Sequence, residues 1–408
     1  MDIFILDVLL RPVDVVDQYI SFIWTERWST FGDFQIVTIA TPDNRRRFVI
    51  DTMISIPQQS KRVMIVESVE EKDDVEKGNV LTVKGRCLNS ILEKRVVTKY
   101  NATHDQLLPS WDTVDISPLQ LLELYFFDIC YTGNLTSGDV IPYVQSQSTP
   151  SLYPAENIPD PYPTGSGFQW SAKPKDMYST FQDICTSYDI GFRFYKDPNA
   201  SALYFESVNG CDRTTQQSTY LPVIFSADMA NLVDTTNLVD NTKYYNAVWV
   251  IYFYKDSSNN DVTMSELVET ADLSLSGGGF QQKVKFLSVT SIPEGTAPAD
   301  IPAYLIKLGQ EELARSQPVN VYDGEVTKNS TYVYEKDYNL GDLVEVRGND
   351  GGTAYMRVVE QIFSSDSSGD SQYPSLITKS FVNPGTWGSW KYNIAWSAVP
   401  DTEFWSNQ

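Results

Sequence analysis

The feature that most constrains this chain is a series of short runs rich in β-branched and aromatic residues, separated by turn-forming or charged segments. Residues of these types favour half-buried strands. Short strands at this spacing are typical of a small antiparallel barrel or sandwich. In the first hundred residues, the runs occupy positions 3–8, 20–28, 34–39, 49–56, 62–69 and 80–85. The N-terminal part is therefore predicted to be a β domain of residues 1–99.

One hairpin in this domain is clear from the local pattern. Two apolar runs, 63–69 and 80–85, flank the strongly charged residues 70–79, which predicts two strands with a solvated tip. A helical turn at 88–95 then closes the domain.

The middle of the chain predicts two helices and a hairpin, within an α+β domain of residues 100–240. Ser117 and Pro118 provide an N-cap and a first-turn proline before the apolar run 119–129. A second helix is expected over 174–189, with one apolar stripe and Gly191 near its end. The stripe consists of Met177, Phe181, Ile184 and Tyr188. Runs at 191–196 and 202–208 flank a turn and predict a hairpin.

Between these helices, residues 131–170 form a Pro/Gly-rich excursion that also contains many Ser, Thr and Tyr residues. Such a composition does not sustain regular structure. The excursion serves contacts with a neighbour or is a passive loop, and the sequence leaves both interpretations open.

Residues 241–317 predict a β domain that ends in a helix at 301–317. Its strands lie at 244–254 and 281–290, joined by a polar connection with three consecutive glycines, 277–279. Those glycines are spaced wrongly for a nucleotide-binding motif. Asp300 is expected to cap the helix, whose apolar face includes Ile301, Leu305 and Leu308.

Residues 318–385 predict a second small antiparallel barrel. Its strands are expected at 319–327, 331–335, 343–348, 354–363 and 376–381, with a tight turn at 349–352. The predicted fold class is thus mainly β with α+β insertions: two small antiparallel β-barrel or sandwich domains plus middle α+β domains.

Residues 386–408 form a Trp-rich terminal arm. Because so much aromatic surface is rarely buried by a single-chain tail, the arm is expected to pack on a neighbour. The candidate contacts with subunits or neighbours are tryptophans, namely Trp24, Trp28, Trp387, Trp390, Trp396 and Trp405.

The charge balance excludes some partners. With 31 basic and 53 acidic residues, the net charge of −22 repels phosphate backbones and anionic membranes. Sequence-specific nucleic-acid binding is disfavoured. The acidity either keeps the protein soluble or lines a conduit through which DNA slides without sticking. No apolar stretch is long enough for a membrane-spanning segment, and the N-terminus lacks the basic residues of an export signal.

Few residues support catalysis. The only histidine is His104, which limits histidine-dependent triads and multi-histidine metal sites to one residue. Four well-separated cysteines, Cys87, Cys130, Cys185 and Cys211, are expected to be reduced core residues. Paired carboxylates for glycoside hydrolysis remain conceivable, but nothing selects two of them. We expect no catalytic residues, no metal and no cofactor, and hence no enzyme.

An ordered series of motifs then resembles a known family. The N-terminal ones are 11–13 (RPV), 21–28 (SFIWTERW) and 32–36 (GDFQI), followed by 63–68, 81–86 and 88–95. Later ones are 189–194 (DIGFRF), 246–250 (NAVWV) and 338–344 (YNLGDLV). The series resembles siphophage tail hub or tail-tip proteins: Gp37-like tail proteins, the N-terminal hub part of tail-associated lysins, and the central hub of contractile baseplates. It spans about residues 1–385.

The resemblance implies a structural role in the virion, at the phage tail tip, after assembly in the host cytoplasm. It implies a homotrimeric ring in which two small barrels per subunit alternate, giving near six-fold symmetry that matches the tail tube. The ring would join tube to tip and enclose the DNA channel, with DNA passing without specific binding. The implied partners are the distal tail protein ring, the tape-measure protein and other tail-tip proteins.

Two other functions stay open. A carbohydrate-binding or glycan-degrading tail-tip protein would use some of the 24 tyrosines and 9 tryptophans to stack on sugars. A secreted bacterial adhesin built from β domains is the other, although the lack of a signal peptide weighs against it.

Overall fold

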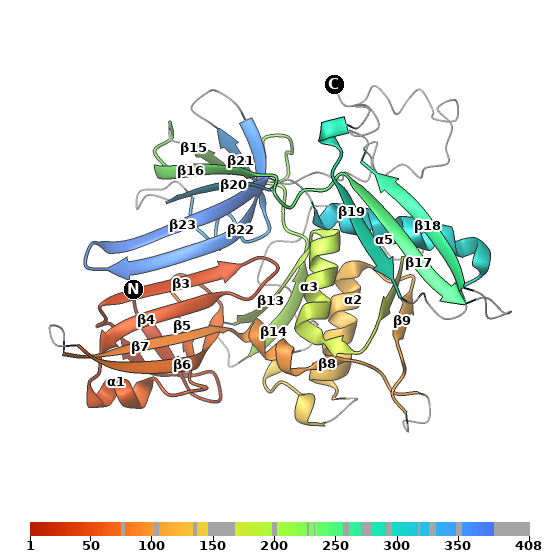
Figure 1. Cartoon of the computed structure of the whole chain (residues 1–408). Coiled ribbons are helices and arrows are strands. Elements are labelled where there is room, and N and C mark those ends of the chain that lie inside the picture. The colour runs from red at the N-terminus through yellow and green to blue at the C-terminus, as the bar shows by residue number, and fades with distance from the viewer. Residues whose placement is uncertain are drawn as a thin grey trace. The chain divides into compact units, whose positions relative to one another are not determined.

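The computed structural model divides the chain into two compact units (Figure 1). Unit 1 comprises Met1–Asp240 and Val319–Thr378, and Asn241–Pro318 belongs to unit 2. The structure describes residues 1–74, 78–101, 106–133, 137–145, 168–197, 202–226, 228–231, 233–255, 261–270, 279–290, 292, 296–316, 319–325, 332–347 and 353–378.

Unit 1 is built around one large sheet, whose described part contains thirteen strands. Seven come from the N-terminal segment: β1 (Ile3–Leu6), β2 (Pro12–Val16), β3 (Ser21–Arg27), β4 (Asp33–Ile39), β5 (Met53–Ser55), β6 (Val63–Asp74) and β7 (Gly78–Cys87). Six come from later: β15 (Ile224–Ser226), β16 (Val233–Asp240), β20 (Val319–Glu325), β21 (Leu343–Arg347), β22 (Thr353–Asp366) and β23 (Gly369–Thr378). The predicted β6–β7 hairpin is confirmed and is longer than its apolar runs.

The sheet runs without interruption from the N-terminal to the C-terminal strands, in the order β16-β20-β23-β22-β3-β4-β7-β6-β5-β1-β2. The junction is the antiparallel pair β22–β3, in which Glu360 faces Arg27 and Ser365 faces Phe22 (Figure 1). β22 reaches both groups because it is long. Its first half pairs with β21 and its second half pairs with β3. Its pairing with β23 shifts in register between Val358 and Glu360.

Two small antiparallel barrels or sandwiches were predicted, and the mainly β class with α+β parts is confirmed, but the described strands form no closed barrel. The path of paired strands ends at β2 and at β16, which do not pair with each other. Both segments also share one hydrophobic core, in which Trp24 and Phe34 cluster with Val358 and Phe363. Local sequence could not reveal this, because the β22–β3 pairing joins residues more than 330 positions apart.

The middle of unit 1 contains two helices, as predicted. α2 (Pro118–Phe126) begins with a capping box, in which Ser117 Oγ accepts from the Gln120 N–H and Gln120 Oε1 accepts from the Ser117 N–H. It continues into the π-helical turn η2 (Phe127–Tyr131). The predicted stripe of α3 (Met177–Tyr188) is buried. Asp189 takes the left-handed cap conformation at φ 53°, in place of Gly191, which begins the next strand.

Shorter elements complete unit 1. The predicted hairpin is confirmed as β13 (Gly191–Lys196) paired with β14 (Leu203–Val208). The others are α1 (Pro42–Arg47), η1 (Leu88–Lys94), β8 (Val96–Val97), β9 (Trp111–Val114), η3 (Ser137–Asp139), β10 (Val144–Gln145), β11 (Gln169–Ala172) and β12 (Lys175–Asp176). β10 pairs with β14 and β11 with β9, so both described ends of the 131–170 excursion join sheets. Residues 146–167 lie outside the described residues.

One prediction for the C-terminal segment differs from the structure. Of residues 331–335, predicted as a strand, the described residues 332–335 contribute turns in which the Val333 and Tyr338 carbonyls accept the backbone N–H groups of Asp337 and Glu335. The turn at 349–352 lies outside the described residues.

Unit 2 is a three-stranded sheet with a helix packed on one face. β17 (Ala247–Lys255) pairs antiparallel with β18 (Asp261–Glu269) and parallel with β19 (Val284–Val289). β18 was missed, because its alternating pattern lies in a segment predicted as a polar connection. The short turns η4 (Gly279–Gln281) and η5 (Pro298–Asp300) precede α5 (Ile301–Arg315). Asp300 is the N-cap residue, but its side chain makes no cap hydrogen bond.

Among the described helices, none is both long and apolar enough to cross a membrane.

Candidate functional site: buried polar contacts between the terminal segments

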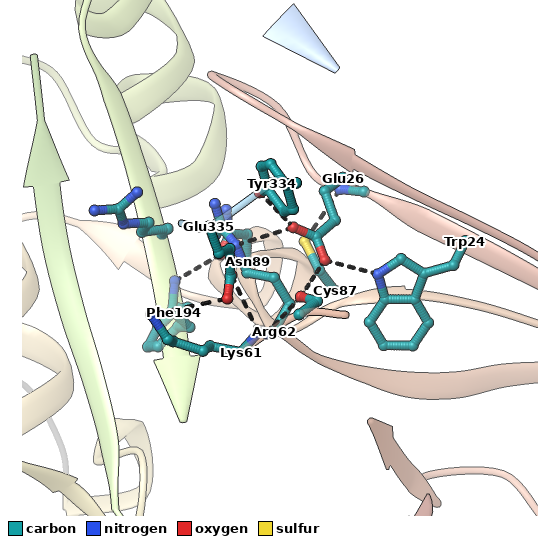
Figure 2. A network of polar contacts seen from close by, with 12 residues as sticks. Trp24, Glu26, Lys61, Arg62, Cys87, Asn89, Phe194, Tyr334 and Glu335 are labelled. Atoms are coloured by element: carbon teal, nitrogen blue, oxygen red, sulfur yellow. Dashed lines mark hydrogen bonds and ion pairs between the residues drawn. The ribbon is translucent and has the colours of Figure 1, made fainter. Parts of the chain in front are cut away.

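A buried carboxylate, Glu26, lies where the N-terminal strands of unit 1 meet the C-terminal segment. Its residue is only 2% exposed. Glu26 Oε1 accepts hydrogen bonds from Trp24 Nε1 at 2.8 Å and from Ser60 Oγ, and Oε2 accepts one from the Tyr334 hydroxyl at 2.8 Å (Figure 2). Trp24 and Glu26 share one face of β3 because side chains alternate along a strand. Both oxygens of the Glu26 carboxylate therefore accept hydrogen bonds that join β3 to other parts of unit 1.

Two cations and a second carboxylate surround this position. Arg62 Nε lies 3.7 Å from Glu26 Oε2, and Lys61 Nζ lies 3.8 Å from Glu335 Oε2. The backbone N–H of Lys61 also donates to Glu335 Oε1 at 3.1 Å (Figure 2). We call these residues, Trp24, Glu26, Ser60, Lys61, Arg62, Tyr334 and Glu335, the Glu26 cluster.

Glu335 is the titratable member whose environment is most altered. Burial and the nearby negative charge of Glu26 raise the pKa of the Glu335 carboxyl above its ordinary value, against the opposing effect of Lys61 and Arg62. Its backbone has a positive φ of 60°, which is uncommon outside glycine. The surrounding contacts therefore hold Glu335 in a conformation that costs free energy.

Beside the Glu26 cluster, Asn89 ties the end of the N-terminal sheet to β13. Asn89 Oδ1 accepts from the Phe194 N–H, and Asn89 Nδ2 donates to the Phe192 carbonyl, both at 3.3 Å. Cys87 Sγ accepts from the Gly32 N–H at 3.1 Å. These bonds satisfy backbone groups that would otherwise be buried without partners.

All four cysteines are free and buried, which confirms the predicted reduced core thiols. Burial raises the pKa of Cys87 and raises that of Cys130 to about 12. Both are therefore poor nucleophiles at neutral pH.

Trp28 is the second point of contact between the segments. A Cβ at Gly191 would lie 2.6 Å from Trp28 Cε3, and one at Gly341 would lie closer still to the same ring. The Arg357 guanidinium lies over the ring, 5.4 Å from its centroid. The indole thus fills a slot that only glycines on two sides leave open.

Ion pairs around Trp28 join the C-terminal strands to the middle of the chain. Arg357 donates to Asp189 Oδ2 at 2.8 Å and to the Gly341 carbonyl. Arg213 Nε donates to the buried Asp342 Oδ2 at 2.7 Å. Breaking a buried pair by removing one partner is strongly destabilising. These contacts therefore hold the C-terminal segment in place.

The structure locates two of the six candidate contact tryptophans. Trp24 is 0% and Trp28 is 5% exposed, so in this chain both side chains belong to the core of unit 1 and not to its surface. Trp387, Trp390, Trp396 and Trp405 lie outside the described residues, as does His104.

The sequence analysis missed the Glu26 cluster. A signal was present, because Glu26 interrupts the apolar run 21–28 and Arg62 precedes the apolar run 63–66. Charged residues inside a strand pattern indicate either an exposed position or a buried polar contact. The hydrogen-bond or ion-pair partner of each charged residue is decided by how the strands pack in the tertiary structure.

These contacts join the terminal segments of unit 1. Within the described residues, no three His, Cys, Asp or Glu side chains are grouped to hold a metal ion. The Glu26 oxygens accept hydrogen bonds from protein donors.

A family model for siphovirus ReqiPepy6 Gp37-like proteins matches residues 2–372. The chain belongs to this family. The match covers both groups of strands in unit 1 and all of the described part of unit 2, so the resemblance inferred from the ordered motifs is confirmed. A comparison with curated proteins by sequence finds no match.

Two solved structures share this fold. The 43 kDa tail protein of prophage MuSo2 from Shewanella oneidensis aligns with a TM-score of 0.53 and 11% identity, over 93% of this chain and 98% of that one. A tail protein from Neisseria meningitidis MC58 aligns with a TM-score of 0.53 and 10% identity, over 93% and 96%. The mainly β fold with α+β parts is therefore shared with phage-type tail proteins.

Proposed function

We propose that this Gp37-like protein is a structural subunit of the phage tail, in which three copies form the hub ring at the tail tip. The observation that carries the proposal is the family match over residues 2–372, which includes every described strand of the large sheet except the end of β23. The fold shared with two tail proteins supports the same role.

The large sheet gives this proposal a physical basis. Each chain supplies two groups of strands, β1–β7 and β20–β23, so three chains would supply six groups around one axis, matching a hexameric tube. Among the described strands, β2 and β16 are paired on one side only. Unpaired strand edges favour association, and a closed ring covers such edges.

The net charge of −22 fits a conduit for DNA. Acidic side chains facing the channel would repel the phosphate backbone, so that DNA passes without specific binding. The neighbours in this arrangement are the distal tail protein ring, the tape-measure protein and other tail-tip proteins.

We also propose that the protein has no catalytic activity. The buried carboxylates of the Glu26 cluster are bonded to protein donors, which suits a structural role. Incubation with host peptidoglycan and surface polysaccharide, followed by detection of released fragments, is expected to give none; release that exceeds a heat-inactivated control would contradict this.

The ring proposal is tested by the oligomeric state. Sedimentation equilibrium is expected to give three times the chain mass of 46.1 kDa, and negative-stain images are expected to show three-fold rings. Antibodies against the chain should label the tail tip of purified virions. A folded protein that stays monomeric at high concentration and is missing from virions would contradict the proposal.

A further inference from the structure

The two faces of the unit 2 sheet differ in what covers them. α5 packs on one face, where Val248, Val250 and Val268 are buried against Leu305. The fit is close at Gly309, where a Cβ would lie 2.5 Å from Val268 Cγ2. This face is a complete small core.

Part of the opposite face is apolar and yet exposed. Alternation along the strands directs Trp249 and Phe253 of β17 away from α5. Across the strands, Trp249 is in register with Leu267 of β18 and with Phe286 of β19. We call these residues the aromatic face: Trp249 (41% exposed), Phe253 (56%), Leu267 (37%), Val284 (41%) and Phe286 (60%).

A contiguous apolar surface of this kind marks an interaction site, whereas scattered apolar residues need no explanation. Leu267, Trp249 and Phe286 form one row across all three strands, since directly paired residues have Cβ atoms about 5 Å apart. Val284 flanks this row beside Ala247, and Phe253 lies further along β17. The aromatic face therefore requires an apolar partner.

The C-terminal sequence contains a segment of matching chemistry. From Trp390 to Ala398 apolar and polar residues largely alternate, with Trp390, Tyr392, Ile394 and Trp396 on one side of the pattern and Lys391, Asn393, Ala395 and Ser397 on the other. Period-two alternation is typical of a strand with one apolar face. The alternating run has nine residues, as β17 does. Residues 386–408 carry only Lys391, Asp401 and Glu403 as charges, so the strong negative charge of the chain does not oppose the contact.

We propose that the C-terminal segment 386–408 binds the aromatic face of unit 2, with the apolar side of residues 390–398 against Trp249, Phe253 and Phe286. Seven residues, 379–385, lie between the end of β23 at Thr378 and the segment, and they span at most about 25 Å when extended. The segment of the same chain supplies the contact, which does not depend on the ring geometry proposed above.

Site-specific crosslinking of the full chain tests the contact directly. With the photoreactive residue p-benzoylphenylalanine in place of Phe286, crosslinked peptides are expected to come from residues 386–408. The same residue in place of Ile39, an exposed position of unit 1, is the control and is expected to give no such peptides. A Phe286 position that crosslinks elsewhere, or not at all, would overturn the proposal. In a mixture of isotope-labelled and unlabelled copies, crosslinks that join different chains would show that a neighbouring copy supplies the segment and would overturn the same-chain contact.

A matched pair of variants tests which side of the alternating run is used. Trp390→Ser with Trp396→Ser is expected to raise the fluorescence of the hydrophobic dye ANS several-fold, because the aromatic face becomes free. Lys391→Ser with Asn393→Ser, on the other side, is expected to leave it unchanged. Adding Phe253→Ser and Phe286→Ser to the tryptophan variant should remove the increase.

Other occupants of the face would give different results. Binding to a glycan array that Phe286→Ser abolishes, without crosslinks to 386–408, would identify a sugar-binding surface and overturn the proposal. Crosslinks only between the aromatic faces of two copies would likewise overturn it. Sedimentation measures the ring separately, so failure of one proposal is distinguishable from failure of the other.

Discussion

At the residue scale, Glu26 shows how a charge is kept inside a β core. Removing a carboxylate from water is costly unless donors replace the lost hydration. Trp24, Ser60 and Tyr334 supply those donors from three separate parts of the chain. The residue therefore stabilises one particular arrangement of these three parts.

Glu26→Gln is expected to lower the free energy of unfolding by about 3 kcal/mol. The amide cannot accept from donors on both sides, and it removes the negative charge 3.7 Å from Arg62. Urea denaturation of both proteins measures the difference. Asp43→Asn is the control: the Asp43–Arg46 pair is exposed, and its loss is expected to cost less than about 1 kcal/mol.

Glu335 is expected to make stability depend on pH with an unusual sign for a carboxylate. Its pKa is raised in the folded state, so the folded protein binds the proton more tightly than the unfolded chain does. The stabilisation by this group is complete below the ordinary pKa of 4.5 and is lost as the pH rises through the folded pKa.

The measurement is the unfolding free energy of the wild type minus that of Glu335→Gln, followed from pH 4 to pH 8. We expect this difference to fall as the pH rises. Glu71→Gln should change in the opposite direction near pH 4.5, because the hydrogen bond from Arg45 lowers the pKa of Glu71. A difference for Glu335→Gln that increases with pH would contradict the assignment.

At the scale of elements, the packing of Trp28 decides how β3 meets the turn before β21. Gly341 has a φ of +89°, and its missing Cβ leaves room for the indole ring. The positive φ and the close approach of the indole both require glycine at this position. The cost of each to stability can be separated by comparison with a glycine that has a positive φ but no close neighbour.

Gly341→Ala is expected to cost about 3 kcal/mol or more, from positive φ together with overpacking. Gly78→Ala is the matched control, since its φ is +75° but nothing lies within 4 Å of a Cβ there. It is expected to cost about 1 kcal/mol. Thermal unfolding measures both variants, and equal losses would show that the Trp28 contact adds nothing.

At the scale of the whole molecule, the N- and C-terminal segments of unit 1 share a sheet and a core, whereas unit 2 has a core of its own. A cavity in either core should therefore weaken all strands around that core, however far apart they are in sequence.

Phe363→Ala in β22 is expected to speed amide hydrogen exchange in β3 and β4 as well as in β22 and β23, but not in β17–β19. Phe363 is 1% exposed in the shared core, and such a truncation costs about 3–5 kcal/mol. Leu305→Ala in α5 is the reciprocal control and should affect only unit 2. Exchange confined to β22 and β23 would mean that the terminal segments are stable independently.

The domain boundaries expected from the sequence, 1–99, 100–240, 241–317, 318–385 and 386–408, stay predictions about separately folding parts. What the structure adds is that strands from the first and fourth of these ranges hydrogen-bond to one another, along β3 and β22.

The sequence by itself determined most local elements. The N-cap at Ser117, the stripe on α3 and the two hairpins follow from interactions within about two dozen residues, which a short window of sequence contains. The motifs likewise indicated the family, because their order along the chain is specific even though each single motif is not.

Only the tertiary structure decided how the strands join. The β22–β3 pairing, the burial of Trp24 and Trp28, and the donors around Glu26 all depend on contacts between residues hundreds of positions apart. β18 was missed because its outward side chains are mostly polar and its register is set by β17. Alternation and propensity specify which face of a strand is apolar, but the partner of that face is selected by packing of the whole chain, and no local pattern contains that choice.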